Sequence, residues 1–257
     1  MLHRSRFGFG TGEHSITFNF FRSLKSEIDR HAPNKVYVVL EGTPIHRIEK
    51  SEGKYKGNRE KITDTAFHRQ KKDIFKLCEL LPVTVIKHPD FECDDVIGTL
   101  SEKYASNGSE VVICSSDSDF IQLLVNPLVT LWNPVKKLFV EEWHVDYLTW
   151  KSLKGDPTDN VPGIKGVGAK TATKLAENNL LLNEFLDKDP LKREAFESAK
   201  SQIKLVNIDL DCHKWFSSTF TFNEKALFSE FKNRDFKTIV GNAWNKWKVT
   251  MEKVCNE

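Results

Sequence analysis

Glu92-Cys93-Asp94-Asp95 is followed, after the apolar run Val111-Val112-Ile113-Cys114, by Ser115-Ser116-Asp117-Ser118-Asp119. The two acidic stretches thus flank a run that is typical of a strand. Hard divalent cations such as Mg²⁺ bind oxygen ligands, so carboxylates grouped in this way favour a metal site. Asp and Glu are also common where a helix begins, because they cap it and suit its dipole. Either stretch alone favours a helix cap, whereas the two together with their flanking motifs favour a metal site.

The composition is that of an ordinary globular protein. The 257 residues, 39% of them hydrophobic, can bury a full core as one large domain or as one domain with a smaller appendage. No apolar run approaches the roughly 20 residues that span a bilayer, and the first residues lack the apolar core of a secretory signal. The five cysteines are scattered without a Cys-x-x-Cys pair, which argues against a disulfide framework and a zinc knot. We expect a cytoplasmic protein that does not enter membranes.

The distribution of charge is more informative than its total. The 38 basic and 36 acidic residues give a net charge of only +2. Basic residues gather between Lys50 and Lys76, ahead of the acidic stretches. A basic segment facing an acidic pocket suits a metal-dependent enzyme that acts on a polyanion, although a solvated helix face explains the lysines equally well.

Alternating apolar runs and amphipathic stretches predict a parallel α/β sheet. We expect strands over residues 36–40, 83–86 and 111–114. Helices are expected over residues 14–30, in a long stretch that ends at Pro82, and from Glu92 to about Tyr104. A hairpin or edge pair is expected around Asn133-Pro134. Glu41 follows the first strand, and open parallel sheets place their ligands at the carboxyl ends of strands.

The sequence changes in character after Trp150. Gly155-Asp156-Pro157-Thr158-Asp159-Asn160 leads into the segment from Val161 to Ala172, which contains the pattern Gly-x-x-Gly-x-Gly-x-Lys. Such glycines allow a tight turn to present backbone N–H groups to a phosphate where the next helix begins. A turn that only joins two helices is the alternative. We favour contact with the DNA backbone, which would not read the base sequence. Residues 175–257 are expected to be helical.

The chain resembles the flap endonuclease and 5′-3′ exonuclease family, most closely its small bacteriophage members and the nuclease domain of bacterial DNA polymerase I. The resemblance runs from Leu2 to about Leu210 and rests on ordered motifs: Tyr55-Lys56-Gly57-Asn58-Arg59, the two acidic stretches, Gly155 to Asn160 and the hairpin from Gly163 to Lys170. It implies an α/β fold with a PIN-like 5′-nuclease core and a mainly parallel, twisted sheet over residues 1–145. This core would include a helical arch over about residues 50–82. Residues 146–257 would form a helix-three-turn-helix (helix-hairpin-helix) DNA-binding region and C-terminal helices.

The resemblance also implies a site for two metal ions. The ligands of the first ion would be Glu41, Glu92 and Asp94, those of the second Asp117, Asp119, Asp156 and Asp159, with Asp95 as an additional member. Two Mg²⁺ ions are implied, which Mn²⁺ can replace, together with a K⁺ ion at the hairpin. One Mg²⁺ would activate a water and the other would neutralise the leaving oxygen, so no nucleophilic side chain is required.

Other residues resemble contacts to DNA. Lys56 and Arg59 match catalytic cations at the base of the arch, which steer the scissile phosphate and stabilise its developing charge. Tyr55 matches an aromatic position on which a terminal base stacks. DNA contacts are further implied for Arg4, Lys151, Gly163, Gly166, Gly168 and Lys170.

The chain departs from the family pattern in two places. Glu41 stands where relatives commonly carry Asp, which keeps the carboxylate but lengthens the side chain. In addition, the chain starts inside a motif whose strand and central Asp ligand would precede Met1, and Arg4 corresponds to an arginine downstream of that Asp. An empty strand position would leave ladder groups unpaired at an energetic cost. We therefore expect the native product to extend before Met1.

We expect a structure-specific 5′-nuclease, acting as a metal-dependent 5′-3′ exodeoxyribonuclease and flap endonuclease in DNA replication or repair of a bacterium or a phage-infected host cell. The expected partners of this monomer are DNA with 5′ flaps, nicks or free 5′ ends, RNA-primer/DNA hybrids, and replication proteins. Two alternatives stay open. The chain could bind branched DNA with weak or no cleavage because one Asp ligand is absent, or it could be an RNA-directed nuclease of the PIN-like type.

Overall fold

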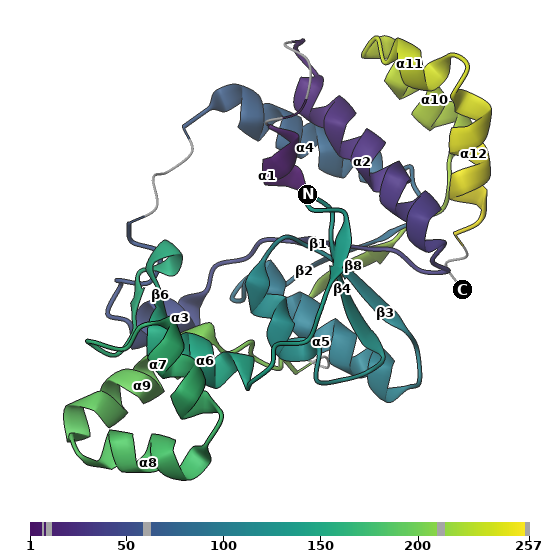
Figure 1. The fold of residues 1–257 in the computed structure, drawn as a ribbon. Helices are drawn as coiled ribbons and strands as arrows, with labels where there is room; N and C mark the ends of the chain where they lie inside the picture. Colours follow the sequence, from purple (N-terminus) through teal and green to yellow (C-terminus); the bar gives the residue numbers. More distant parts are fainter. Residues whose placement is uncertain (7, 9–11, 59–62, 210–213, 255–257) are drawn as a thin grey trace. The chain divides into compact units, whose positions relative to one another are not determined.

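The computed structural model describes residues 1–6, 8, 12–58, 63–209 and 214–254, and only the backbone of His3 and Arg4. The chain divides into two compact units whose segments interleave along the sequence (Figure 1). The first unit contains Met1–Leu40, Ile62–Lys87 and Cys212–Glu257, and the second contains Glu41–Lys61 and His88–Asp211. The domains predicted from the sequence, residues 1–145 and 146–257, have other boundaries than these two units and remain a prediction.

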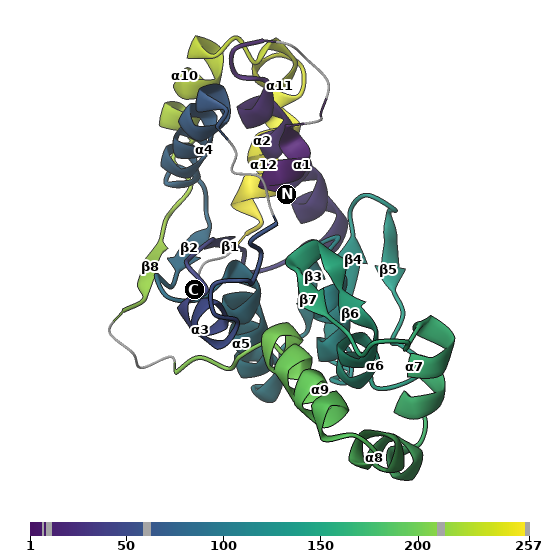
Figure 2. The ribbon, with the colours of Figure 1, turned by 90° about the vertical axis from the view of Figure 1, so that its left-hand side faces the viewer.

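The first unit is built around helix α2 (Ser15–His31). Its residues Ile16, Phe20, Leu24 and Ile28 recur at every fourth position and are buried, as the amphipathic pattern predicts. Helix α4 (Thr65–Cys78) lies beside α2 in both views of the ribbon (Figures 1 and 2). The remaining helices of this unit are α1 (Leu2–Ser5), α10 (Glu224–Asn233), α11 (Lys237–Val240) and α12 (Trp244–Glu252).

A three-stranded sheet completes the first unit. Strand β1 (Tyr37–Leu40) pairs in parallel with β2 (Thr84–Lys87), and β2 pairs antiparallel with β8 (Phe216–Thr219). The first two strands confirm the prediction from the apolar runs. The prediction that residues 175–257 are helical is wrong at β8, because this short polar segment is held by its backbone pairing with β2 and carries no readable periodicity.

The second unit also contains a three-stranded sheet. Strand β3 (Val111–Cys114) pairs in parallel with β4 (Val129–Asn133), and β4 forms an antiparallel hairpin with β5 (Leu138–Val140). Helix α5 (Cys93–Ser106) packs on β3. The strands β3, β4 and β5 lie side by side in Figure 2. This sheet confirms the predicted strand at residues 111–114 and the predicted hairpin.

Short elements and helices before, within and after this sheet in the chain make up the rest of the second unit. Their core contains the buried residues Phe120, Leu153 and Leu186. The elements are α3 (Ile45–Lys50), η1 (Ser118–Leu123), α6 (Tyr147–Lys154), β6 (Gly155–Asp156), η2 (Pro157–Asp159), β7 (Val161–Pro162), α7 (Ala169–Ala176), α8 (Asn179–Asp187) and α9 (Pro190–Ile203).

The mixed α/β class is as predicted, but the sheet is not mainly parallel in the described residues. Each three-stranded sheet has one parallel and one antiparallel pair. A tight turn can join only antiparallel strands, which explains the hairpin of β4 and β5. The predicted arch, about residues 50–82, includes positions 59–62, which lie outside the described residues. Among the helices that the structure describes, none has the length and apolar character to cross a membrane.

Candidate metal and nucleic-acid site

Seven of the eight predicted metal ligands lie where helices begin in the second unit. Glu92 is the N-cap residue of α5, Asp117 that of η1 and Asp156 that of η2. The first turn of α5 adds Asp94 and Asp95, that of η1 adds Asp119 and that of η2 adds Asp159. The Oδ1 atom of Asp117 accepts a hydrogen bond from the Asp119 amide at 3.0 Å, and that of Asp156 from the Thr158 amide at 2.9 Å. Capping by Asp117 and Asp156 uses one carboxylate oxygen each, so it does not prevent the other oxygen from binding a cation.

Three carboxylates from two separate segments converge in this unit. Asp119, Asp156 and Asp159 can each offer an oxygen atom, and these atoms lie within 4.8 Å of one another. Burial raises the pKa of Asp119 to about 6, Lys151 acts in the opposite direction, and the charges of Asp117 and Asp156 raise the pKa further. Carboxylates held together in this way repel one another unless a cation lies among them.

Lys151 of α6 supplies a positive charge to this group. Its ammonium contacts Asp119 and lies 2.8 Å from Oδ2 of Asp156, and the residue is only 7% exposed. Burial opposes the charged form of Lys151, but the carboxylate of Asp119 and the hydrogen bonds with both partners raise its pKa. The predicted DNA contact of Lys151 does not fit this geometry, because the ammonium faces the acidic group and is shielded from solvent.

A second acidic group surrounds Asp94. Burial, followed by the charges of Asp117 and Glu41, raises the pKa of Asp94 to about 7. The Sγ atom of Cys93 donates a hydrogen bond to Oδ1 of Asp94 at 3.4 Å, and burial with the charges of Asp94 and Glu41 raises the pKa of this thiol. Glu41, which follows β1 in the sequence, therefore acts on the same carboxyl group as Asp117, which follows β3.

Glu92 is held by three donors. Its Oε2 atom lies 2.9 Å from Nη1 of Arg47 and 2.9 Å from the hydroxyl of Tyr55, and its Oε1 atom contacts the ammonium of Lys56. The Tyr55 hydroxyl also lies 3.2 Å from Oδ2 of Asp159, and the Lys56 ammonium lies 3.6 Å from the same atom. The segment from Tyr55 to Lys56 therefore connects Glu92 with Asp159, and so brings the predicted ligands of the first and second ion together.

The predicted role of Tyr55 as a stacking platform does not fit its position. The residue is 7% exposed, and the cations of Arg47 and Lys56 lie over its ring, at 5.8 and 5.1 Å from the ring centre. A nucleic-acid base would need an open ring face. Burial and the neighbouring Glu92 raise the pKa of Tyr55, which keeps its hydroxyl neutral and able to donate. Arg59 and the side chain of Arg4 lie outside the described residues.

Arg47 is the residue that sequence reasoning missed, and it engages the predicted ligand Asp95. The Asp95 side chain is fully buried, with Oδ1 2.6 Å from Nη2 and Oδ2 2.5 Å from Nη1 of Arg47. Oδ1 also accepts a hydrogen bond from the Val206 amide at 2.9 Å. Both oxygens of Asp95 are therefore engaged. No periodic pattern in the short helix α3 distinguishes a buried arginine from an exposed one.

The Gly-rich hairpin lies between α6 and α7. Gly155 has a φ of +83° and its Cα lies against the backbone of Gly163, where a Cβ atom would come within 2.3 Å of the Gly163 nitrogen. Gly166 also has a positive φ, of +83°. Gly168 is the N-cap residue of α7 and has no capping side chain, and Lys170 is exposed in the first turn. The turn thus leaves the start of α7 accessible to an anion.

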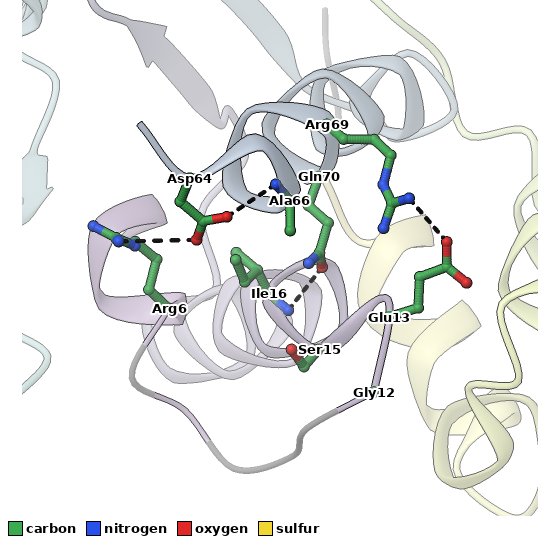
Figure 3. A pocket seen from close by; sticks show the side chains of 9 residues that line it. All are labelled: Arg6, Gly12, Glu13, Ser15, Ile16, Asp64, Ala66, Arg69 and Gln70. Atoms are coloured by element: carbon green, nitrogen blue, oxygen red, sulfur yellow. Dashed lines mark hydrogen bonds and ion pairs between the residues drawn. The ribbon is translucent and has the colours of Figure 1, made fainter. Parts of the chain in front are cut away.

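A separate pocket of about 390 Å³ lies in the first unit, beside the start of α2 and α4 (Figure 3). Its two arginines face carboxylates: Arg69 lies 3.0 Å from Glu13, and Arg6 lies 4.0 Å from Asp64. The Oε1 atom of Gln70 accepts hydrogen bonds from the first amides of α2, including that of Ile16 at 2.9 Å. Because these charges and amides are engaged with one another, the pocket is not a candidate for the site predicted from the sequence.

Comparison with known proteins identifies the class to which this fold and acidic site belong. The family model for the 5′-3′ exonuclease, N-terminal resolvase-like domain, matches residues 4–149. A 5′-3′ exonuclease of Aquifex aeolicus is 34% identical over 213 residues, which cover 76% of this chain and 72% of that protein. The chain therefore belongs to the 5′-3′ exonuclease family.

Longer relatives match the same part of the chain, and solved structures share its fold. The thermostable DNA polymerase I of Thermus thermophilus is 34% identical over 202 residues, which cover 75% of this chain but 24% of the polymerase. The chain thus spans about a quarter of the length of such relatives. The flap endonuclease of bacteriophage T5, solved with DNA and metal ions, superimposes with a TM-score of 0.60 over 96% of this chain and 94% of that chain. At 20% identity, this likeness concerns the fold alone.

Proposed function

We propose that this protein is a metal-dependent, structure-specific 5′-nuclease that hydrolyses DNA phosphodiester bonds at 5′ ends and flaps, in replication or repair. The observation that carries the proposal is the gathering of carboxylates from distant segments around the partly buried Asp94 and Asp119. Burial raises the pKa of Asp94 to about 7 and that of Asp119 to about 6. Perturbed carboxyl groups of this kind cluster at functional sites, and a bound cation would reverse their mutual repulsion.

The donor atoms fit two hard divalent cations. Asp119, Asp156 and Asp159 would hold one ion through oxygens that lie within 4.8 Å of one another. Glu41, Asp94 and Asp117 would hold the other, together with Glu92. These sets contain oxygen ligands, which suit Mg²⁺ and Mn²⁺. When bound, the two ions would supply an activated water and neutralise the leaving oxygen.

Lys56 would supply the protein's own positive charge to the scissile phosphate. Its side chain is 20% exposed, and its ammonium contacts Glu92. Glu92 holds the ammonium in place, and the hydroxyl of Tyr55 in turn binds Glu92. A cation fixed before the substrate arrives stabilises developing charge without reorganisation. Arg59 would act beside Lys56, as the family resemblance implies.

The hairpin would bind the DNA backbone. The amides at the start of α7 and the exposed Lys170 would contact phosphate, while Gly163, Gly166 and Gly168 would allow the DNA backbone to approach closely. These contacts are independent of base sequence, which suits an enzyme that recognises DNA structure. A K⁺ ion at the hairpin, a monomeric state and contacts with replication proteins remain predictions.

Cleavage of a labelled 5′-flap DNA substrate tests this proposal. We expect cleavage by the purified protein in Mg²⁺ or Mn²⁺ and none with a chelator. Asp94→Asn and Asp119→Asn should each lower the rate by more than about 100-fold, since loss of a ligand's outer-shell partner alone costs up to about 100-fold in affinity. Asp187→Asn, at a carboxylate that is 67% exposed, is the matched control and should cleave normally.

Three outcomes of this assay contradict the proposal. The first is a folded parent protein that binds flap DNA without turnover in either metal, which would favour a branched-DNA-binding protein. The second is faster cleavage of a matched RNA flap than of the DNA flap. The third is full activity in both Asp94→Asn and Asp119→Asn.

A further inference from the structure

The guanidinium group of Arg47 has every donor engaged within the second unit. A guanidinium carries five N–H donors. Nε lies 2.8 Å from the carbonyl oxygen of Gln202, and Nη2 lies 3.0 Å from that of Lys204. Nη1 lies 2.9 Å from Oε2 of Glu92, and the two terminal nitrogens form a fork with both oxygens of Asp95 at 2.5 and 2.6 Å. Arg47 is 2% exposed, so none of these bonds competes with bulk water.

Arg47 is held in place by contacts other than its contact with Glu92. The fork with Asp95 attaches Arg47 to α5, and the two carbonyl contacts attach it to the end of α9 and the residues that follow. Burial opposes the charge on Arg47, but the hydrogen bonds and charge of Asp95 raise its pKa, so it stays a cation. Planar, bidentate pairs of this kind restrict geometry more than a lysine does.

We infer that Arg47 and Asp95 form a positioning pair that orients Glu92 toward the metal ions, an inference that rests on the proposed function. Oε2 of Glu92 faces two donors, Arg47 and the hydroxyl of Tyr55. Among the residues that the structure describes, Oε1 contacts the ammonium of Lys56. Arg47 therefore holds Glu92 so that Oε1 is the oxygen that faces cations, the ammonium of Lys56 in this structure and a metal ion when one binds. Asp95, with both oxygens bonded to Arg47, orients the arginine and is not itself a ligand.

A purely structural pair would behave differently. Arg47 joins α3, α5 and the end of α9, and loss of this junction alone would lower the stability of the fold without changing the affinity for metal. A positioning pair predicts that the affinity changes as well, because a misdirected Glu92 loses its bond to the cation. Outer-shell partners of metal ligands typically contribute about 10- to 100-fold in affinity. Direct metal binding therefore separates the two roles.

Titration of the purified protein with Mn²⁺, followed by electron paramagnetic resonance in the absence of DNA, is the test. We expect Arg47→Gln and Asp95→Asn to weaken Mn²⁺ binding by about 10- to 100-fold. Arg47→Lys keeps the charge but loses the fork, so its affinity for Mn²⁺ should lie between that of these variants and that of the parent. Thermal unfolding of each variant reports whether it folds. Arg193→Gln, which removes an exposed arginine paired with Asp187, is the control and should leave Mn²⁺ binding within about twofold of the parent.

The outcomes distinguish this inference from the function on which it rests. Folded Arg47→Gln and Asp95→Asn variants that bind Mn²⁺ as tightly as a metal-binding parent contradict the positioning role alone. A parent that binds no Mn²⁺ and cleaves no flap contradicts the proposed function and the inference with it. If Arg47→Gln does not fold, Arg47→Lys and Asp95→Asn decide by the same comparison, since unchanged affinity in these variants also contradicts the inference.

Discussion

The ammonium of Lys151 lies 2.8 Å from Oδ2 of Asp156 and also contacts Asp119. The lysine is almost fully buried, so the two carboxylates are its immediate surroundings in place of water. A buried cation that bonds two anions balances charge locally, and removing it leaves the anions uncompensated. This relationship makes Lys151 part of the acidic site and gives it a measurable effect on stability.

Lys151→Met should destabilise the protein in the absence of divalent ions. Breaking a buried ion pair by removing one partner costs about 3–5 kcal/mol, because the remaining charge stays buried. The loss should be larger at alkaline than at acidic pH, since protonation of Asp119 relieves the repulsion. Urea unfolding measures both effects. Lys154→Met, at an exposed position of the same helix, is the control, and equal stability of the two variants would contradict the assignment.

Tyr55→Phe separates a positioning hydroxyl from a stacking ring. The hydroxyl faces carboxylates on Glu92 and Asp159, and a hydrogen bond to a charged group contributes about 1.5–3 kcal/mol to stability. We therefore expect Tyr55→Phe to lower the free energy of unfolding by this amount and to need a higher metal concentration for cleavage. DNA binding should be retained. Tyr55→Leu should bind DNA equally well. Selective loss of DNA affinity in Tyr55→Leu would instead support the stacking role that the sequence predicts.

The stability of the metal-free protein should fall as the pH rises from about 4 to about 7. The pKa of Asp94 is raised from 3.8 to about 7, and that of Asp119 from 3.8 to about 6. Between the unfolded and folded values the native state binds more protons, so it is stabilised below this window and loses that contribution as the pH rises through it. Thermal unfolding with a chelator measures the trend, and Asp94→Asn should flatten it.

Magnesium should reverse this trend. Deprotonated carboxylates bind the cation, so the gain in melting temperature on adding Mg²⁺ should be larger at about pH 8 than at about pH 5. A stability that rises steadily over this range without metal, or a Mg²⁺ effect that is independent of pH, would mean that these carboxyl groups do not titrate as a buried acidic site.

Lys170→Ala tests the hairpin as a backbone contact. The exposed lysine lies in the first turn of α7, where a phosphate would bind. Its loss should weaken binding about equally for unrelated DNA sequences and reduce the salt-dependence slope by about 1. Fluorescence anisotropy at several salt concentrations measures this slope. Lys136→Ala, in the turn between β4 and β5, serves for comparison, and a sequence-dependent effect of Lys170→Ala would argue against phosphate contact.

The sequence predicts those elements that a local pattern specifies. The apolar runs gave the positions of β1, β2 and β3, and apolar residues at every fourth position gave α2. Strand β8 was missed because its pairing with β2 joins segments far apart in the chain. A prediction of one mainly parallel sheet failed for the same reason, since edge pairings are decided by tertiary contacts.

The candidate site, too, could be predicted only where a local pattern specifies it. Acidic residues could be located because their motifs are local, and the structure brings Asp119, Asp156 and Asp159 together. The basic residues that contact these carboxylates could not be predicted from local motifs. Arg47 meets Asp95 across 48 positions of sequence, and Lys151 looks like any surface lysine until burial is known. Tyr55 and Lys151 are buried where their predicted DNA contacts assume exposure, and those roles stay predictions.

Anomalous diffraction from crystals grown with Mn²⁺ tests the central claim most directly. The account predicts two peaks within bonding distance of carboxylate oxygens, one among Asp119, Asp156 and Asp159 and the other among Glu41, Asp94 and Asp117, with Oε1 of Glu92 contributing. Well-ordered crystals with saturating Mn²⁺ and no peak at these carboxylates would contradict it.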